Sequence, residues 1–390
     1  MKILYFCQLY FPAIYGGGEY IFFYWAKELV RRGHKVYVVA QRIRGGKDYE
    51  VIDGINVYRT GPAVEYKGSL PLNLFENLGY IVGALLKGLM LILKNRIDII
   101  HSNTYAPAIA GQICAIISKK PHIITFHDVY HLSMKRFWNK WASHSFVGSS
   151  IAKIGPYIEK LVLKLPATLF HTPSETSKRD LRSCGLRKVI VIPNGLSLRE
   201  YDSIDVENVN VHQAIFVGRL VFYKNLDIAV KAMKKITTKI PDVRLLVIGD
   251  GPERVSLKSL VEKLGLDRNI IFEGRVSDET KIKKIKESSF LILPSVCEGF
   301  GIVIIEAFAC YKPVIVSDVE PLSELVENRQ DGLLVSPFDF ESWAEAMLFL
   351  FTQPEFSREM GKRGREKTEQ KYTIQRVVDQ LEKTYMTLIE

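Results

Sequence analysis

The sequence alternates short apolar runs with stretches of helical periodicity, and this alternation occurs twice along the chain. Apolar runs separated by amphipathic helical stretches are typical of a parallel sheet that helices cover on both faces. The expected strands are 3–7, 36–40, 56–59, 97–101 and 122–126, then 214–217, 244–248, 270–272, 290–293, 313–316 and 332–335. The expected helices include 19–32, 78–94 and 106–118, then 225–236, 253–264 and 301–309. The sequence therefore predicts an α/β fold with two Rossmann-like domains in tandem.

The length of the chain agrees with two domains, because its 390 residues exceed the roughly 250–300 that one hydrophobic core fills. Between the two halves the chain turns polar and loses its periodicity. We therefore expect an N-terminal domain at 1–197, a linker at 198–212 and a C-terminal domain at 213–372. The last segment, 373–390, is an expected helix with no strand after it, so it is free to return to the N-terminal domain.

The composition, 47% hydrophobic and 25% charged, excludes disorder and low complexity. Five cysteines without a C-x-x-C pair argue against a zinc site or a disulfide framework and favour the cytoplasm. We expect no signal peptide, because Met1 and Lys2 run directly into the first apolar stretch.

The longest apolar segment, 78–93, contains Lys87 and is shorter than the about 20 residues that span a bilayer. We expect a buried helix there, or at most an interfacial one.

The net charge of +10 is unevenly distributed. Residues 1–195 hold 26 Lys and Arg against 12 Asp and Glu, whereas residues 196–390 hold 27 against 31. A basic first half indicates an anionic partner. Nucleic acid, an anionic membrane and an anionic acceptor are all candidates.

Three sequence features follow expected strands, where α/β sheets bind their ligands. Gly16, Gly17 and Gly18 precede a helix and could bring its amides close to an anion, although a flexible turn explains them equally well. The fingerprint G-x-G-x-x-G is absent, which weighs against NAD chemistry. Arg219 and Lys224 follow the strand 214–217 and are suited to phosphate, the alternative being solvated surface cations.

The third and most specific feature is the run from Glu298 to Glu306. Gly299 and Gly301 free the amides at the start of a helix to hold a phosphate. Glu306 stands within an apolar helix, where a carboxylate without a partner is costly. Both glutamates are therefore candidates for binding sugar hydroxyls.

With these features the chain resembles the family 4 glycosyltransferases of the two-domain GT-B architecture, whose domains face each other across a cleft. The resemblance covers essentially the whole chain and implies transfer of a sugar from a nucleotide-sugar to an acceptor hydroxyl with retention. The motifs that carry it are Gly16–Glu19, Gly33–Val36, Asp98–His101, Phe126–Asp128, Pro193–Gly195, Gly218-Arg219 with Lys224, Gly249–Pro252, Phe272–Val276 and Glu298–Glu306. The family usually has an aspartate two residues after Pro-Asn-Gly. In this chain that position is occupied by Ser197.

The resemblance implies a catalytic set of Arg219 and Lys224 on the donor diphosphate, Glu298 on a hydroxyl of the donor sugar, and His127 on the transferring sugar. The further residues that it implies are Gly17 and Gly18 at the diphosphate, Glu306 at the ribose, the backbone of Phe300, Gly301, Ile302 and Val303 at sugar and phosphate, Arg275 and Val276 at the base, and Glu19 and Asp128 on the acceptor side.

Neither a metal nor a cofactor is expected, and the nucleotide-sugar is a substrate. The cations and the helix N-terminus can stabilise the departing diphosphate, and no D-x-D run suited to a divalent ion is present.

A basic and aromatic segment contains Lys135, Arg136, Phe137, Trp138, Lys140 and Trp141. Interleaved rings and cations suit the surface of an anionic membrane, the alternative being a helical cap on its own domain. We therefore expect a cytoplasmic enzyme, peripheral to the membrane, with a lipid-linked or anionic glycan acceptor. A nucleotide-sugar epimerase of the same fold is an alternative, and so is a nucleic-acid-binding protein, although no nucleic-acid-reading module is recognised.

Overall fold

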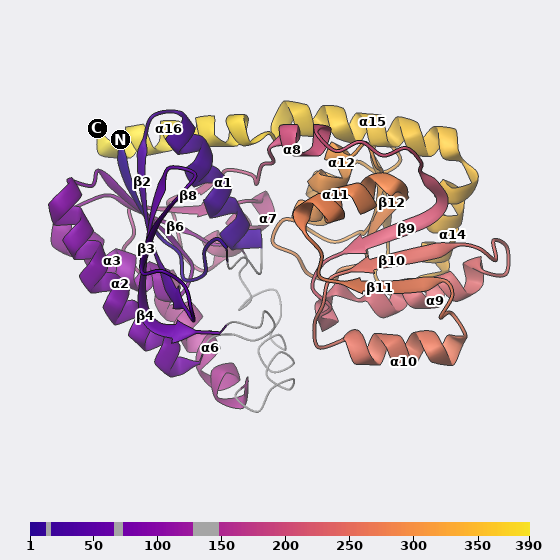
Figure 1. The fold of residues 1–390 in the computed structure, drawn as a ribbon, viewed down its shortest axis with the longest axis horizontal. Helices are drawn as coiled ribbons and strands as arrows, with labels where there is room; N and C mark the ends of the chain where they lie inside the picture. Colours follow the sequence, from indigo (N-terminus) through magenta and orange to yellow (C-terminus); the bar gives the residue numbers. More distant parts are fainter. Residues whose placement is uncertain (13–16, 66–72, 128–147) are drawn as a thin grey trace. The chain divides into compact units, whose positions relative to one another are not determined.

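The computed structural model describes residues 1–12, 17–65, 73–127 and 148–390 and divides the chain into two compact units (Figure 1). The first unit comprises Met1–Gly195 together with Ile374–Glu390, and the second comprises Leu196–Thr373. Each unit is built around its own sheet, as expected for two Rossmann-like domains.

The first unit contains an eight-stranded sheet. Its strands pair in parallel except for the hairpin that β3 makes with β4. In sheet order they are β3 (Tyr49–Ile52), β4 (Ile55–Val64), β2 (Lys35–Ile43), β1 (Lys2–Phe6), β5 (Ile99–Asn103), β6 (His122–Thr125), β7 (Leu169–Thr172) and β8 (Val189–Val191).

Helices cover both faces of this sheet (Figure 1). On one face the ring of Tyr5 meets that of Phe22 from α1 at 5.2 Å. On the other face Phe6 packs in a core cluster with Tyr80 of α2. The helices of the unit are α1 (Gly17–Arg31), α2 (Leu74–Asn95), α3 (Ala106–Ser118), α6 (Gly148–Leu163), α7 (Glu175–Ser183) and α16 (Ile374–Ile389).

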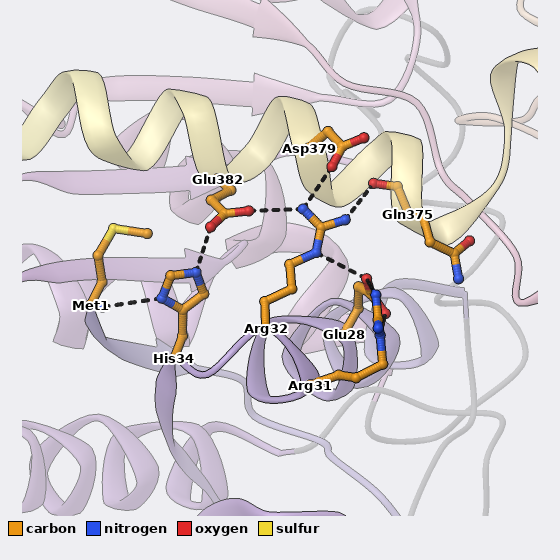
Figure 2. Close-up of polar contacts among 8 residues, drawn as sticks. All are labelled: Met1, Glu28, Arg31, Arg32, His34, Gln375, Asp379 and Glu382. Atoms are coloured by element: carbon orange, nitrogen blue, oxygen red, sulfur yellow. Dashed lines mark hydrogen bonds and ion pairs between the residues drawn. The ribbon is translucent and has the colours of Figure 1, made fainter.

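The last helix, α16, packs against α1 in the first unit, which confirms the expected return of the C-terminal segment. Figure 2 shows the polar contacts that hold the two helices together. Arg32 donates to Asp379 at 2.7 Å and to Glu382 at 2.8 Å, and Glu382 also contacts His34 at 2.7 Å. Tyr385 of the same helix is fully buried against β1 and β5.

The second unit contains a six-stranded sheet whose strands all pair in parallel. In sheet order they are β11 (Ile270–Gly274), β10 (Arg244–Ile248), β9 (Asn210–Val217), β12 (Ser288–Leu293), β13 (Val314–Ser317) and β14 (Gly332–Val335). Its helices are α8 (Leu198–Asp202), the short 3₁₀ helix η1 (Phe222–Lys224), α9 (Leu226–Ile236), α10 (Arg254–Leu264), α11 (Asp278–Glu287), α12 (Ile302–Ala309), α13 (Leu322–Leu325), α14 (Phe340–Thr352) and α15 (Pro354–Lys371).

The segment 198–212 differs from the linker expected there. It contains α8 and the first residues of β9, and it belongs to the second unit. Tyr201 is buried, and Asp202 accepts two hydrogen bonds from Arg365 at 2.8 and 3.0 Å. Asp202 contacts a residue far away in the sequence. The local sequence pattern of 198–212 therefore gives no sign that the segment folds with the second unit.

For 78–93 we expect a buried helix or at most an interfacial one, and the structure shows that the first alternative is wrong for one side of the helix. Tyr80, Ala84, Gly88, Leu91 and Ile92 of α2 face the sheet and are buried. The opposite side of α2 is exposed. In the most apolar stretch of 18 residues within α2, only 28% is buried. Among the described residues, α2 is the one helix long and apolar enough to cross a membrane by length and composition alone.

Candidate functional site

In the first unit, Gly18 lies directly against His127. Gly18 is in the first turn of α1, and His127 follows β6 at the carboxyl end of the sheet. A Cβ atom at position 18 would lie only 2.8 Å from Nε2 of His127 and 3.4 Å from Nδ2 of Asn103. At neighbouring Gly17 a Cβ atom would meet no atom of the described residues within 4 Å. Close packing against His127 therefore requires glycine at position 18, and this contact makes no such demand on position 17.

The His127 side chain is a neutral imidazole with an unused nitrogen. Burial, together with nearby His171, lowers the pKa of His127 to about 3. Its Nε2 atom is buried and has no hydrogen-bond partner among the residues that the structure describes. A buried polar atom without a partner is rare in folded proteins, so this nitrogen is suited to a ligand.

Of the two acceptor-side candidates, Glu19 lies in the first turn of α1 beside Gly18. Cys7 follows β1, and burial raises the pKa of its thiol. The negative charge of the Glu19 carboxylate raises this pKa further. Glu19 therefore lies close to the end of β1. Asp128 and Gly16 lie outside the described residues, as does the basic and aromatic segment Lys135–Trp141.

In the second unit, the structure brings Lys224 and Glu298 together. Lys224 ends η1 after β9, and Glu298 lies in the loop after β12, the neighbouring strand. Lys224 Nζ forms an ion pair with Glu298 Oε1, which also accepts a hydrogen bond from Ser295 Oγ at 2.7 Å. The two charged side chains are only 13% and 12% exposed. Two motifs 74 residues apart thus form one site.

Arg219 lies on the same connection as Lys224, between β9 and η1. Its Nη2 atom donates to the hydroxyl of Tyr223 at 2.9 Å, and the Tyr223 ring also lies 5.9 Å from Lys224 Nζ. The buried Tyr223 thus contacts both cations of this motif.

The start of α12 provides backbone donors beside the glutamate loop. Gly301 has a φ of +89°, and a Cβ atom there would lie 2.9 Å from Cδ2 of Leu322. Ile302 and Val303 open the helix, where amides have no acceptor one turn earlier. Phe300 is buried against Tyr372, with ring centroids 6.0 Å apart. The side chain of Phe300 therefore anchors the loop, while the amides after it are available to an anion.

Glu306 is buried, as its apolar helix suggested, and the structure shows its partners. The side chain is 4% exposed. Its Oε1 atom accepts from Lys281 Nζ at 2.9 Å and from the Tyr201 hydroxyl at 3.2 Å. Burial alone would lower the pKa of Lys281, but the Glu306 and Asp278 carboxylates raise it above its usual value. Sequence reasoning missed both partners, because α8 and α11 carry no motif that points to them.

Arg275 and Val276 follow β11, at the same edge of the sheet as the other strand ends. Gly274 before them has a φ of +76°, and Arg275 is exposed whereas Val276 packs on the core. Among the described ranges of the chain, no three His, Cys, Asp or Glu side chains gather as a metal site. The absence of a metal requirement stays a prediction.

Comparisons with known proteins agree with this arrangement. Residues 15–200 match the family described as Glycosyltransferase Family 4, and residues 199–367 match the family described as Glycosyl transferases group 1. A similar protein is the uncharacterized glycosyltransferase MJ1607 of Methanocaldococcus jannaschii. It is 28% identical over 367 residues, which are 88% of this chain and 87% of that protein.

Two solved structures share the fold at low sequence identity. Sucrose-phosphate synthase of Thermosynechococcus elongatus has a TM-score of 0.81 and 21% identity, covering 99% of this chain and 98% of the other. HepE of Anabaena in complex with UDP-glucose has a TM-score of 0.75 and 20% identity, covering 99% and 100%. These likenesses confirm the GT-B fold.

Proposed function

The chain belongs to the family 4, group 1 glycosyltransferases and is a transferase enzyme, and from this premise we propose a specific reaction. A sugar moves from a nucleotide-diphosphate sugar to an acceptor hydroxyl, with retention of configuration and without a metal ion. The observation that carries the proposal is the pairing of Lys224 with Glu298 at the carboxyl ends of β9 and β12. The pairing supports the proposal because a cation for phosphate then lies beside a carboxylate that can accept from a sugar hydroxyl.

The cations of the second unit act on the leaving group. Breaking the glycosidic bond leaves negative charge on the terminal phosphate of the nucleoside diphosphate. Lys224 has three N–H donors, so one bond to Glu298 leaves others for phosphate oxygens. Arg219 and the amides at the start of α12 add further donors, and such preorganised donors usually supply the largest share of catalysis.

The carboxylates bind the neutral parts of the donor. Glu298 accepts from a hydroxyl of the transferring sugar. Glu306 uses Oε1 for Lys281 and Tyr201, so its second oxygen accepts from the ribose. The backbone near Arg275 and Val276 contacts the base.

Residues of the first unit act on the transferring sugar and the acceptor. The unused Nε2 of neutral His127 forms a hydrogen bond to a sugar hydroxyl, and Gly17 and Gly18 approach the diphosphate. For retention, the acceptor hydroxyl attacks on the face that the phosphate leaves, and a phosphate oxygen takes its proton. We assign Glu19 to the acceptor side, and Asp128 with it on the sequence resemblance alone.

The donor and the acceptor are proposed as classes. HepE was solved with UDP-glucose, which makes a UDP-sugar the first donor to test. We propose a lipid-linked or anionic glycan as acceptor, and a cytoplasmic enzyme at the periphery of a membrane. The basic first half of the chain supports an anionic acceptor or surface.

The experiment combines donor binding with turnover. Purified full-length protein is screened for thermal shifts with UDP-, GDP- and ADP-glucose, since a ligand that binds the folded state raises its stability. Release of the nucleoside diphosphate is then measured with the best donor, with and without EDTA. The variants R219A and K224A should bring the rate near background while keeping the fold. The control is K239A, which removes an exposed lysine in the turn after α9.

Three results would contradict the proposal. They are an unchanged rate in R219A and K224A at saturating donor, loss of the rate with EDTA, and conversion of the donor into its epimer without transfer.

A further inference from the structure

The outer side of α2 and α3 forms an exposed apolar surface on the first unit, which we name the α2/α3 face. The two helices lie side by side over the sheet (Figure 1). Five α2 side chains, exposed by 42% to 83%, follow one another at helical spacing: Leu78, Val82, Leu86, Met90 and Leu93. From α3 come Ile113, Ile116 and Ile117, which are exposed by 36% to 60%.

These exposed side chains are not needed for the core of the first unit. A helix that covers a sheet buries one stripe and normally presents polar residues to water. Here a second stripe, including Ala84 and Leu91, already faces the sheet and is buried. Large contiguous apolar patches on a protein surface mark an interaction site. The α2/α3 face therefore has a use outside the fold.

Cations border this face at one end. Both helices connect parallel strands, so they run in the same direction and end at the same edge of the sheet. Lys94 and Arg96 are at the end of α2, and Lys119 and Lys120 are at the end of α3. None of the four pairs with a carboxylate within the described ranges of the chain.

Negative charge is nearly absent from the same stretch. From the start of α2 to residue 121 there are two acidic residues, Glu76, which caps the N-terminus of α2, and Asp98. The Oδ2 atom of Asp98 accepts a hydrogen bond from the backbone amide of Lys2 at 2.7 Å. The α2/α3 face therefore combines an uncharged apolar surface with an unneutralised basic border.

The opposite end of the face lies near the candidate site. Asn77, in the first turn of α2, accepts a hydrogen bond from Gln8, which follows β1, at 3.0 Å. The carboxyl ends of parallel β1 and β6 lie at one edge of the sheet, and His127 follows β6. The first turn of α2, with Phe75 exposed by 74%, thus lies at the edge that carries His127.

We propose that the α2/α3 face docks on the surface of an anionic lipid bilayer. Its apolar side chains enter the boundary between headgroups and acyl chains, as in interfacial amphipathic helices. Lys94, Arg96, Lys119 and Lys120 contact anionic headgroups. Charge complementarity selects lipid over a second copy of the chain. For these four cations a copy offers from α2, α3 and their connection only Glu76, which caps the first turn of α2, and Asp98, which accepts from the Lys2 amide. The proposal uses none of the residues of the segment Lys135–Trp141, and docking requires no sugar transfer.

The test is co-sedimentation of full-length protein, without donor, with phosphatidylglycerol–phosphatidylcholine vesicles and with phosphatidylcholine vesicles. We expect binding to the anionic vesicles that weakens at high salt. L86E/L93E should lower the partition coefficient at least tenfold. K94Q/K119Q should lower it about 30-fold, since each basic residue near an anionic surface contributes about 1 kcal/mol. If L86E/L93E does not fold by circular dichroism, L86S/L93S replaces it.

Matched controls lie on the second unit. V255E changes an apolar residue of α10 that is exposed by 79%, and K239Q/K263Q removes two exposed lysines. Both should bind as the wild type does. Equal binding of the wild type to both vesicles would overturn the proposal, as would equal losses in the controls. Two further results would do so: loss of binding in F137S/W138S alone, or a dimer that L86E/L93E dissociates and that binds no vesicles. Transfer activity is measured separately, so the docking surface and the proposed transfer reaction can each fail alone.

Discussion

Lys281 Nζ lies 2.9 Å from Glu306 Oε1, with the lysine side chain 15% exposed and the carboxylate 4% exposed. The pair joins α11 to α12 in the second unit. Tyr201 of α8 donates to the same oxygen at 3.2 Å. Lys281 therefore orients the carboxylate that we assign to the ribose.

Replacing Lys281 by methionine should leave a buried carboxylate without its cation. We expect K281M to lower the free energy of unfolding by about 3 kcal/mol and to weaken binding of UDP. K281R should restore binding in part. Urea unfolding and the thermal shift with UDP measure the two effects. The control is K231M, which removes an exposed pair with Asp227 and should change stability by less than about 1 kcal/mol. Equal stability of K281M and K231M would contradict the assignment.

Gly18 should not tolerate even one added carbon. In G18A the new methyl group would lie 2.8 Å from His127 Nε2, so the imidazole must move. We expect the rate of nucleoside diphosphate release to fall more than tenfold, with a loss of stability of about 1–3 kcal/mol. G17A, whose methyl group meets no atom of the described residues within 4 Å, should keep the stability of the wild type and serves as the stability control. A rate in G18A equal to that of the wild type would show that the contact with His127 has no functional role.

Arg32 should fix the C-terminal helix far more strongly than its neighbour Arg31. Both donate to Glu28, but Arg32 also binds Asp379, Glu382 and the carbonyl of Gln375 (Figure 2). We expect R32A to lower the free energy of unfolding by about 2–3 kcal/mol. R31A removes a side chain that is 66% exposed and should cost less than about 1 kcal/mol. Urea unfolding gives the stabilities, and limited proteolysis detects release of 374–390. Equal sensitivity of the two variants would be evidence against this role.

Buried histidines should make the first unit sensitive to acid. Burial lowers the pKa of His171 to about 4, although its hydrogen bond to the carbonyl of Ile192 raises it slightly. Burial also lowers the pKa of His122 to about 3. The unfolded chain, with histidine pKa values near 6.5, binds more protons than the folded one below that pH. The stabilising contribution is therefore complete above pH 6.5 and is lost as the pH falls toward 4 and then 3.

This pH dependence can be measured by urea unfolding between pH 7 and pH 4. Stability should fall with pH, and the fall should be smaller in H171Q, which removes one titrating group. A profile that is flat in the wild type, or unchanged in H171Q, would refute the explanation. His34, which is not fully buried, provides the control variant H34Q.

Much of the fold could be predicted because the spacing of apolar residues shows whether a helix or strand is buried on one face or on two. All expected strands and helices are present, with ends shifted by a few residues. The hairpin of β3 and β4 was missed although Asp53 and Gly54, with φ of +49° and +81°, give the usual turn signal. The strand β7, Leu169–Thr172, was missed because two of its four residues, His171 and Thr172, are polar yet buried.

The sequence by itself determined the fold class and the motifs at the strand ends, because periodicity and glycine positions are local properties of the chain. Only the tertiary structure decided which charges meet. Lys224 contacts Glu298, Glu306 contacts Lys281, and Gly18 contacts His127. It also decided that α2 buries one stripe and exposes another. These outcomes depend on which elements become neighbours in a sheet, and neighbouring strands bring together side chains that no short stretch of sequence contains.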